Sequence, residues 1–244
     1  MKKDVFKKFI DLYYLEGSIN QAKINIENNS ANVKLMASDK TIMGSVALET
    51  ISLTDHEICI GDTGALLGQM APLGNDIELD YNTTDKKISG LIFKSNDAHQ
   101  IEATYMLADP SVIDKAGTLK QVPNYELELE LTSELASALI SLKNSLPDSK
   151  SFTFNLENDQ LFVIVGYTSD IATNRTTMKV PAQITGTPDL KTKSFSANNI
   201  KSVLSVNKGF KSGKILIYSQ GLLTFKFEHE GMTSEYHLVQ LKNV

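Results

Sequence analysis

The hydrophobic pattern of the last part of the chain changes from helical to strand-like. Ile200, Val203 and Leu204 recur at helical spacing, and alternating apolar stretches begin after Gly213. The candidate start and stop residues of the helix are Ser196, Asn198 and Gly209. The short breaks "QG" and "GM" then separate three strands. The pattern therefore predicts one amphipathic helix followed by a meander of hairpins.

The same order of elements occurs earlier in the chain. An alternating stretch from Tyr125 precedes a helical pattern over 132–146, and three strand-like stretches follow it. The first half repeats this order, with strand 56–62, a short helix over 63–73 and three further strands. Before that repeat come three strands and, ahead of them, a helix near the N-terminus with an apolar side made by Val5, Phe6, Phe9, Ile10 and Tyr13. The sequence thus predicts an α+β fold of four helix-plus-strands units in two domains, 1–108 and 125–244, joined by a connector over 109–124 that contains Pro and Gly.

Composition narrows the class of protein. The chain has 244 residues, 41% of them hydrophobic, which is enough for one large or two ordinary domains. Its net charge of -5 means that nucleic-acid binding would need locally concentrated Lys and Arg. The single cysteine, Cys59, excludes an intramolecular disulfide framework and fits a reducing compartment. With no apolar run of signal-peptide or transmembrane type, we expect a cytoplasmic protein.

Motifs for catalysis are missing from the sequence. It contains no P-loop, no dinucleotide fingerprint, no HExxH and no GxSxG. Glu228, His229, Glu230 and His237 are the nearest approach to a site. Strand alternation turns His229 away from its two neighbouring carboxylates, which argues against a shared metal site. We therefore expect neither an enzyme nor a cofactor or metal.

Short motifs, together with the twice-repeated domain plan, give the chain a resemblance to sliding clamps of DNA replication. These are "ADPS" at 108–111, Asp62 followed by "LLG" at 66–68, and the terminal hairpins over 213–239. The chain resembles the clamps of T-even-type bacteriophages and the fold of proliferating cell nuclear antigen. The resemblance implies a homotrimeric ring of six similar domains, with helices lining a central hole and sheets outside.

The resemblance also implies that lysines on the hole-lining helices attract duplex DNA without reading its sequence. The candidates are Lys3, Lys7, Lys8, Lys143, Lys201, Lys208 and Lys211. The alternative is that these lysines only solvate exposed helix faces. The second helix, "TGALLGQMAPL", carries no positive charge, so the lining would not be uniformly basic.

Partner proteins of such clamps insert a short tail into an apolar pocket between the two domains. By position, the resemblance assigns this pocket Met36, Ile42, Val112, Ile113, Leu238 and Val239. The implied partners are a DNA polymerase, through its C-terminal tail, and a clamp loader. The alternative for each residue is ordinary core. Val112 and Ile113 are the strongest candidates, because apolar side chains in a connector need an explanation.

Subunits of a clamp join through strand edges. The family-matched edges are the strand over 101–107 and a strand over 176–184, in which Pro181 is tolerated because edges can accept proline. The interface candidates are Ile101, Thr104, Tyr105, Leu107, Met178, Val180, Pro181 and Ile184.

Two other classes of function stay open on the sequence alone. A β-rich structural or assembly protein of a virion would use duplicated sheets as oligomeric edges, and its lysines would only be solvated. A hydrolase that uses surface carboxylates is the third possibility, although nothing pairs two of them as acid and base.

Overall fold

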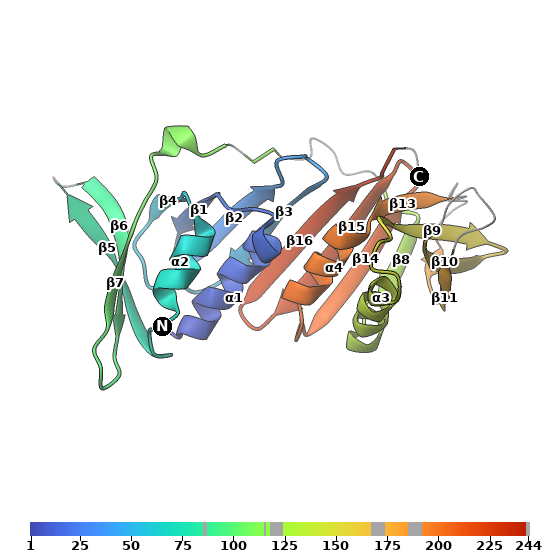
Figure 1. Ribbon diagram of the computed structural model, residues 1–244. Coiled ribbons are helices and arrows are strands. Elements are labelled where there is room, and N and C mark those ends of the chain that lie inside the picture. The colour runs from blue at the N-terminus through green and yellow to red at the C-terminus, as the bar shows by residue number, and fades with distance from the viewer. Residues whose placement is uncertain (85–86, 115, 118–123, 167–173, 185–191, 243–244) are drawn as a thin grey trace. The chain divides into compact units, whose positions relative to one another are not determined.

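Two compact units make up the chain in the computed structural model (Figure 1), which describes residues 1–84, 87–114, 116–117, 124–166, 174–184 and 192–242. The first unit contains Met1–Met36, Ser45–Gly117 and Gly231–Thr233. The second contains Ala37–Gly44, Thr118–Glu230 and Ser234–Val244. Most of each predicted domain thus falls in one unit, with two short segments exchanged.

The first unit combines two helices with antiparallel sheets. Four of its strands are hydrogen-bonded in the order β3-β2-β1-β4, and a separate three-stranded sheet has the order β5-β6-β7. Its elements are α1 (Lys3–Tyr14), β1 (Ala22–Glu27), β2 (Ser30–Met36), β3 (Ile42–Leu48), β4 (His56–Ile60), α2 (Thr63–Met70), β5 (Ile77–Thr84), β6 (Lys87–Ser95) and β7 (Glu102–Met106). Short 3-10 turns at Leu15–Gly17 and Pro110–Val112 follow α1 and β7.

The second unit repeats this plan with more strands. Strands β12-β8-β14-β15-β16 lie in that order, and a four-stranded sheet has the order β11-β10-β9-β13. Its elements are β8 (Leu127–Glu130), α3 (Ser133–Ser145), β9 (Ser151–Glu157), β10 (Gln160–Val165), β11 (Thr176–Val180), β12 (Gln183–Ile184), β13 (Lys193–Ser196), α4 (Ala197–Val206), β14 (Ser212–Tyr218), β15 (Leu222–His229) and β16 (Met232–Val239). The α+β class and the repeated order of helices and strands are confirmed.

Aromatic side chains of α1 fasten the helix to the core of the first unit. Phe6, Phe9 and Tyr13 are fully buried, as the helical spacing predicts. The ring of Phe6 lies 6.0 Å from that of Phe93 on β6. Val5, which the pattern placed on the same apolar side, is instead 38% exposed. The buried stripe is therefore narrower than predicted and leaves the rest of α1 to polar side chains.

The N-terminal residues pair with the chain ahead of β5. Lys2 forms an isolated antiparallel bridge with Asp76, and the backbone N–H of Lys3 donates to the carbonyl of Asn75 at 2.8 Å. The N–H of Ile77 donates to the carbonyl of Met1 at 3.0 Å. These bonds fix the start of α1 against the three-stranded sheet.

The strand predicted over 176–184 is in fact two strands in two sheets. β11 ends at Val180 and pairs with β10, whereas β12 begins at Gln183 and pairs with β8. Pro181 lies at the break, where its missing N–H and fixed φ interrupt the ladder. The single-strand prediction is therefore wrong, and Ile184 lies in a different sheet from Met178.

Candidate nucleic-acid interface

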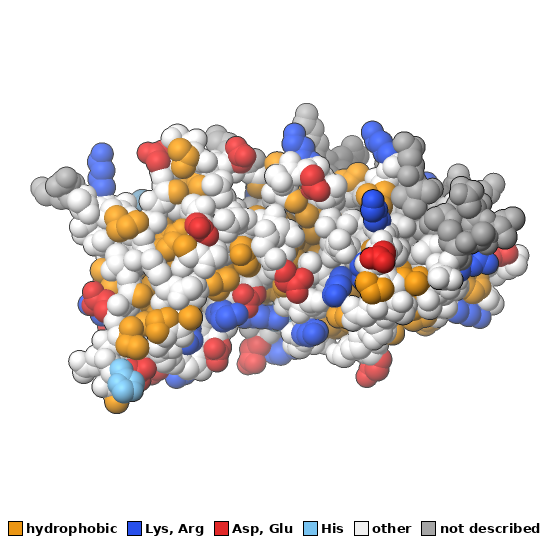
Figure 2. Space-filling view, viewed as in Figure 1, with side chains coloured by type: hydrophobic (Ala, Val, Ile, Leu, Met, Phe, Trp, Pro, Cys, Tyr) orange, Lys and Arg blue, Asp and Glu red, His pale blue; other side chains and the backbone are white. Residues whose placement is uncertain are grey.

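Helix α4 buries one face and turns lysines to another. Ser196 caps its start by accepting a hydrogen bond from the N–H of Asn199 at 3.3 Å. Ile200 and Val203 are fully buried, whereas Lys201 is only partly buried. Lys208 is exposed just beyond the end of the helix. Figure 2 shows cationic side chains over α1 and α4. The predicted amphipathic helix is present, and Lys201 lies outside its buried face.

A buried amide holds the C-terminal end of α4. The side-chain carbonyl of Asn207 accepts hydrogen bonds from Ser234 Oγ at 2.7 Å and from His229 Nε2 at 3.0 Å, so this ring nitrogen carries the proton. The Asn207 amide nitrogen donates to the carbonyl of Val203 at 2.8 Å. The network ties the helix end to β15 and β16, and it thereby fixes where Lys208 leaves the fold. Sequence spacing did not identify Asn207, because two of its partners, His229 and Ser234, lie more than twenty residues away.

The three lysines of α1 differ in their surroundings. Lys3 Nζ donates to the carbonyl of Leu73 in the turn after α2, so its charge is directed to that turn. Lys7 is exposed and forms an ion pair with Asp11 at 2.6 Å, one helical turn away. Burial lowers the pKa of Lys8, as does Lys7, while Asp11 opposes this shift. The helix thus offers Lys7 and Lys8 to a ligand more readily than Lys3.

Lys143 was predicted among the DNA-binding lysines, and the structure corrects this prediction. Its side chain is 5% exposed, and its ammonium group donates to the carbonyls of Pro147 at 2.5 Å and Ser149 at 2.8 Å. Burial lowers the pKa of Lys143, and the nearby charge of Lys201 lowers it further. The chain after α3 turns back and surrounds this lysine, which helical spacing does not reveal. Lys143 therefore closes a turn and cannot also contact a phosphate.

Removal of the Lys143 ammonium group should destabilise the second unit. We expect Lys143→Met to lower the free energy of unfolding by about 1–3 kcal/mol, because two carbonyls lose their donor. Exposed Lys150 supplies the control, and Lys150→Met should stay within about 0.5 kcal/mol of the parent. Urea unfolding followed by circular dichroism measures both. Equal stability of the two variants would contradict the assigned role.

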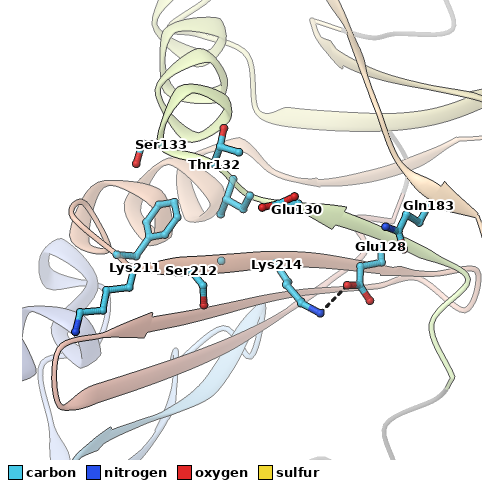
Figure 3. Close-up of a pocket in the computed structure, with 11 residues that line it drawn as sticks. Glu128, Glu130, Thr132, Ser133, Gln183, Lys211, Ser212 and Lys214 are labelled. Atoms are coloured by element: carbon cyan, nitrogen blue, oxygen red, sulfur yellow. Dashed lines mark ion pairs between the residues drawn. The ribbon is translucent and has the colours of Figure 1, made fainter.

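Lys211 lines a cavity of about 490 Å³ beside the start of α3 (Figure 3). Glu128 and Lys214, which also line this cavity, form an ion pair at 2.7 Å. Lys214 lowers the pKa of Glu128, and Glu128 raises the pKa of Lys214. Glu130 adds a further carboxylate. Because both signs of charge line this cavity, it has no clear preference for an anion.

Helix α2 differs from α1 and α4, as the sequence predicted. Its start is capped by Asp62, whose side chain accepts from the N–H of Ala65 at 3.0 Å. Ala65 and Gly68 are exposed, and a Cβ at Gly68 would meet nothing within 4 Å. Over α2, Figure 2 shows mainly apolar and uncharged atoms. Helix α2 therefore presents an uncharged surface.

The described part of the connector is attached to the first unit. Asp109 accepts from the N–H and the hydroxyl of Ser111, which lowers the pKa of its carboxyl, and Lys23 Nζ donates to the carbonyl of Pro110 at 2.7 Å. Ile113 is 4% exposed, whereas Val112 is 63% exposed. The attachment therefore separates the two favoured candidates, with Ile113 in the core and Val112 presented to solvent. Residues 115 and 118–123 of the predicted connector lie outside the described residues.

The other partner-pocket candidates divide in the same way. Val239 is 42% exposed, whereas Ile42 and Leu238 are each 1% exposed and belong to the core. Met36 is partly buried and lies beside Gly117, where a Cβ would be 3.3 Å from its sulfur. Of the six predicted residues, Val112 and Val239 are thus the exposed ones.

A second, buried apolar cluster, whose members are 2–8% exposed, lies on the face of β14 and β15 opposite their main core, and sequence spacing did not identify it. Leu216 and Tyr218 share a face of β14 with exposed Lys214, and Leu222 on β15 is the direct partner of Tyr218. The ring of Tyr125, which is 40% exposed, meets that of Tyr218 edge-on at 6.4 Å. The unbroken apolar run from Ile215 to Tyr218 was the available signal, because strict alternation would put polar residues at every second position.

Both predicted subunit edges are edge strands among the described residues. β7 pairs only with β6, and β11 pairs only with β10. Tyr105 is buried, and its hydroxyl exchanges hydrogen bonds with the backbone of Asp62 at the start of α2. Thr104 and Pro181 are exposed, and Val180 is buried. The remaining candidates, Ile101, Leu107, Met178 and Ile184, are partly buried.

Across the described residues, no three His, Cys, Asp or Glu side chains converge as metal ligands. His229 is engaged with Asn207, and His237 Nδ1 lies 2.8 Å from Thr224 Oγ1. Burial raises the pKa of the Cys59 thiol, which is 2% exposed. A search of the same residues for a helix long and apolar enough to cross a bilayer finds none.

Comparison with known proteins supplies the fold family. No family model and no curated sequence matches the chain. Proliferating cell nuclear antigen (PCNA) from Entamoeba histolytica matches 99% of this chain over 96% of its own, with a TM-score of 0.77 and 15% identity. The A. fulgidus PCNA bound to the C-terminal region of FEN-1 matches 100% over 98%, with a TM-score of 0.75 and 15% identity. A match to the PCNA2-PCNA3 complex of Sulfolobus tokodaii covers 97% and 96%, with a TM-score of 0.74 and 10% identity. The chain therefore has the sliding-clamp fold of PCNA over nearly its whole length.

Proposed function

We propose that this protein is a ring-shaped sliding clamp without catalytic activity of its own. Three copies form a closed ring around duplex DNA, and the ring tethers the replicative polymerase for processive synthesis. The observation that carries the proposal is the match to PCNA structures over nearly the full length of both chains. Lys201 and Lys208, which lie outside the buried face of α4, support it.

The chemistry of the lysines suits a sliding contact. Lys7, Lys8, Lys201, Lys208 and Lys211 contact phosphates, which are the same at every position of the duplex. Lys3 of α1 adds charge where its ammonium group meets the turn after α2. Lys143 is not assigned to DNA, because its ammonium group donates to carbonyls of its own unit. Because the surface of α2 is uncharged, this part of the lining has no group that binds DNA phosphates strongly. Such a lining holds DNA loosely enough for movement along it.

Partner proteins supply an apolar tail segment. The A. fulgidus clamp is bound by the C-terminal region of FEN-1, so a clamp of this fold receives a C-terminal segment of a partner. In this chain the exposed apolar side chains available to a polymerase tail are Val112 on the first unit and, separately, Val239 on the second. A clamp loader, which uses the same surfaces, opens and closes the ring. The site of action is the cytoplasm, that of the host if a phage encodes the protein.

A topological experiment tests the proposal. The purified protein is incubated with its loader, ATP and a nicked circular plasmid, and is then passed through a sizing column in high salt. We expect protein to stay with circular DNA and to be lost when the plasmid is linearised, because a closed ring can leave only over an end. Sedimentation should also give a mass three times that of the 26.9 kDa chain.

Two outcomes would contradict the clamp. One is equal retention of the protein on circular and linear DNA. That result would indicate direct binding to DNA, which salt should weaken, instead of a ring around it. The other is a stable monomer at micromolar concentration that fails to bind DNA under any condition. A large assembly that does not bind DNA would instead favour the alternative hypothesis, a structural protein of a virion.

A further inference from the structure

The turn between β2 and β3 is closed by its own backbone and by one carboxylate. The N–H of Ala37 donates to the carbonyl of Ile42 at 2.9 Å, and the N–H of Lys40 donates to the carbonyl of Ala37 at 2.9 Å. One carboxylate oxygen of Asp39 accepts from the N–H of Thr41 at 3.0 Å and from its hydroxyl at 2.8 Å. Aspartate closes turns in this way because its short side chain reaches the backbone two residues on. The turn therefore holds Thr41 in one orientation.

The Thr41 hydroxyl is also bonded by helix α4. The side-chain nitrogen of Asn199, in the first turn of this helix, lies 2.9 Å from Thr41 Oγ1. A hydroxyl has one proton and a carboxylate only accepts, so Thr41 donates to Asp39 and accepts from Asn199. This arrangement satisfies all three groups, which belong to the second unit. We call the hydrogen bond from Asn199 to Thr41 the tether.

The backbone of Thr41 holds the exposed end of β16. Val239 is the last residue of this strand, and its N–H donates to the carbonyl of Thr41 at 3.1 Å. The side chain of Val239 is 42% exposed and is available to a polymerase tail. Thr41 thus joins two parts of the second unit, because its hydroxyl is bonded to α4 and its carbonyl to the backbone of Val239.

We infer that Thr41 is a positioning residue for capture of the partner tail, and that Asn199 of α4 holds it in place. The inference rests on the proposed function, since it concerns the tail that Val239 is proposed to contact. Ordering a mobile segment costs free energy when a ligand binds, and a turn that is already fixed lowers this cost. Thr41 acts through Val239, whose backbone it holds.

Replacing Thr41 by valine removes the hydroxyl and keeps the size of the side chain. We expect Thr41→Val to bind a fluorescent peptide with the sequence of the polymerase C-terminus about fivefold more weakly, because both hydrogen bonds of the hydroxyl are lost. Fluorescence anisotropy measures this affinity. Thr41→Ser keeps the hydroxyl and should bind within about twofold of the parent. Equal loss in the two variants would show that the methyl group matters and the tether does not, and would overturn the inference.

Aspartate at position 199 separates positioning from stability. Asn198 and Asn199 both lie in the first turn of α4, where the helix dipole favours a carboxylate, so neither aspartate should lower the free energy of unfolding. The new carboxylate of Asn199→Asp cannot donate to Thr41, and it competes with Asp39 for one hydroxyl proton. We expect this variant to bind the peptide at least about fivefold more weakly. The matched control Asn198→Asp, at an exposed neighbour, should bind as the parent does.

Amide hydrogen exchange tests the tether in the free protein. Because the N–H of Val239 is bonded to Thr41, loss of the tether should make it exchange about fivefold faster in Thr41→Val and in Asn199→Asp. Mass spectrometry of fragments that contain Val239 measures this rate. The parent and Asn198→Asp should exchange alike. Faster exchange without any loss of peptide affinity would overturn the inference, because the tether would then order the strand without aiding capture.

The outcomes separate the inference from the proposed function. If the parent binds the peptide and both Thr41→Val and Asn199→Asp bind it equally well, the inference is wrong and the assignment of Val239 to the partner stands. Failure of the parent itself to bind the peptide would overturn both. Affinity that falls in proportion to stability, in Asn198→Asp as well, would indicate a merely structural role and would overturn the inference alone.

Discussion

Replacing Lys201 and Lys208 together by glutamate should reduce processive synthesis to the level seen without the clamp. In the proposed trimer the change reverses charge at six positions of the surface that we assign to DNA. Each lost phosphate contact should lower the slope of log affinity against log salt by about 0.9. The fold should persist, because Lys201 is only partly buried, Lys208 is exposed, and the apolar face of α4 is unchanged.

The measurement is product length in primer extension with the cognate polymerase and loader, alongside circular dichroism and sedimentation. Lys34→Glu/Lys242→Glu is the matched control, since both lysines are exposed, lie outside the helices and give the same change in net charge. The control should keep long products. Normal processivity of the Lys201→Glu/Lys208→Glu trimer would mean that α4 does not face DNA.

Val112→Asp combined with Val239→Asp should abolish capture of the polymerase tail. Both side chains are exposed, so the aspartates cost the fold little, yet each places a charge where an apolar tail residue would lose water. Loss of hot-spot contacts of about 2 kcal/mol or more corresponds to at least about 30-fold weaker binding. A fluorescent peptide with the sequence of the polymerase C-terminus measures this by anisotropy.

The control for tail capture is Thr50→Asp/Ser52→Asp, at two exposed residues of the segment after β3. It should bind the peptide as the parent does. Ile113 is left unchanged in both variants, because it is buried and its replacement would test the core instead. Unchanged peptide affinity in the Val112→Asp/Val239→Asp variant would contradict the assignment of both side chains to the partner.

Local patterns predicted the parts of this fold that depend on neighbours along the chain. The spacing of Ile200, Val203 and Leu204 was sufficient to find α4 and the side on which Lys201 lies, because a helix face is fixed by sequence separation alone. The resemblance to a family predicted that β7 and β11 lie at the edges of their sheets, and the strand order places both there. Exposure of Val112 but not Ile113 could not be predicted, since it depends on how the connector attaches to the first unit.

Other predictions failed where distant segments meet. Lys143 was assigned to DNA because the pattern shows a lysine in a helix, but not the turn of 147–149 that returns over it. The break at Pro181 was visible in the sequence and was interpreted only as an edge signal. The cluster around Tyr218 was missed because apolar residues on both faces of β14 were taken for ordinary alternation.

The enclosure of Lys143 offers an internal standard for chemical footprinting of this protein. Amine-acylating reagents modify ammonium groups that solvent can reach, and the Lys143 ammonium group is covered and occupied by two carbonyls. Its labelling in the native state reports only transient opening of the turn after α3. The labelling of Lys201 or Lys208 in the presence of a duplex can therefore be compared with that of Lys143 in the same sample. A decrease at Lys201 or Lys208 alone indicates contact with DNA, whereas a decrease at Lys143 as well indicates that the whole second unit opens less often.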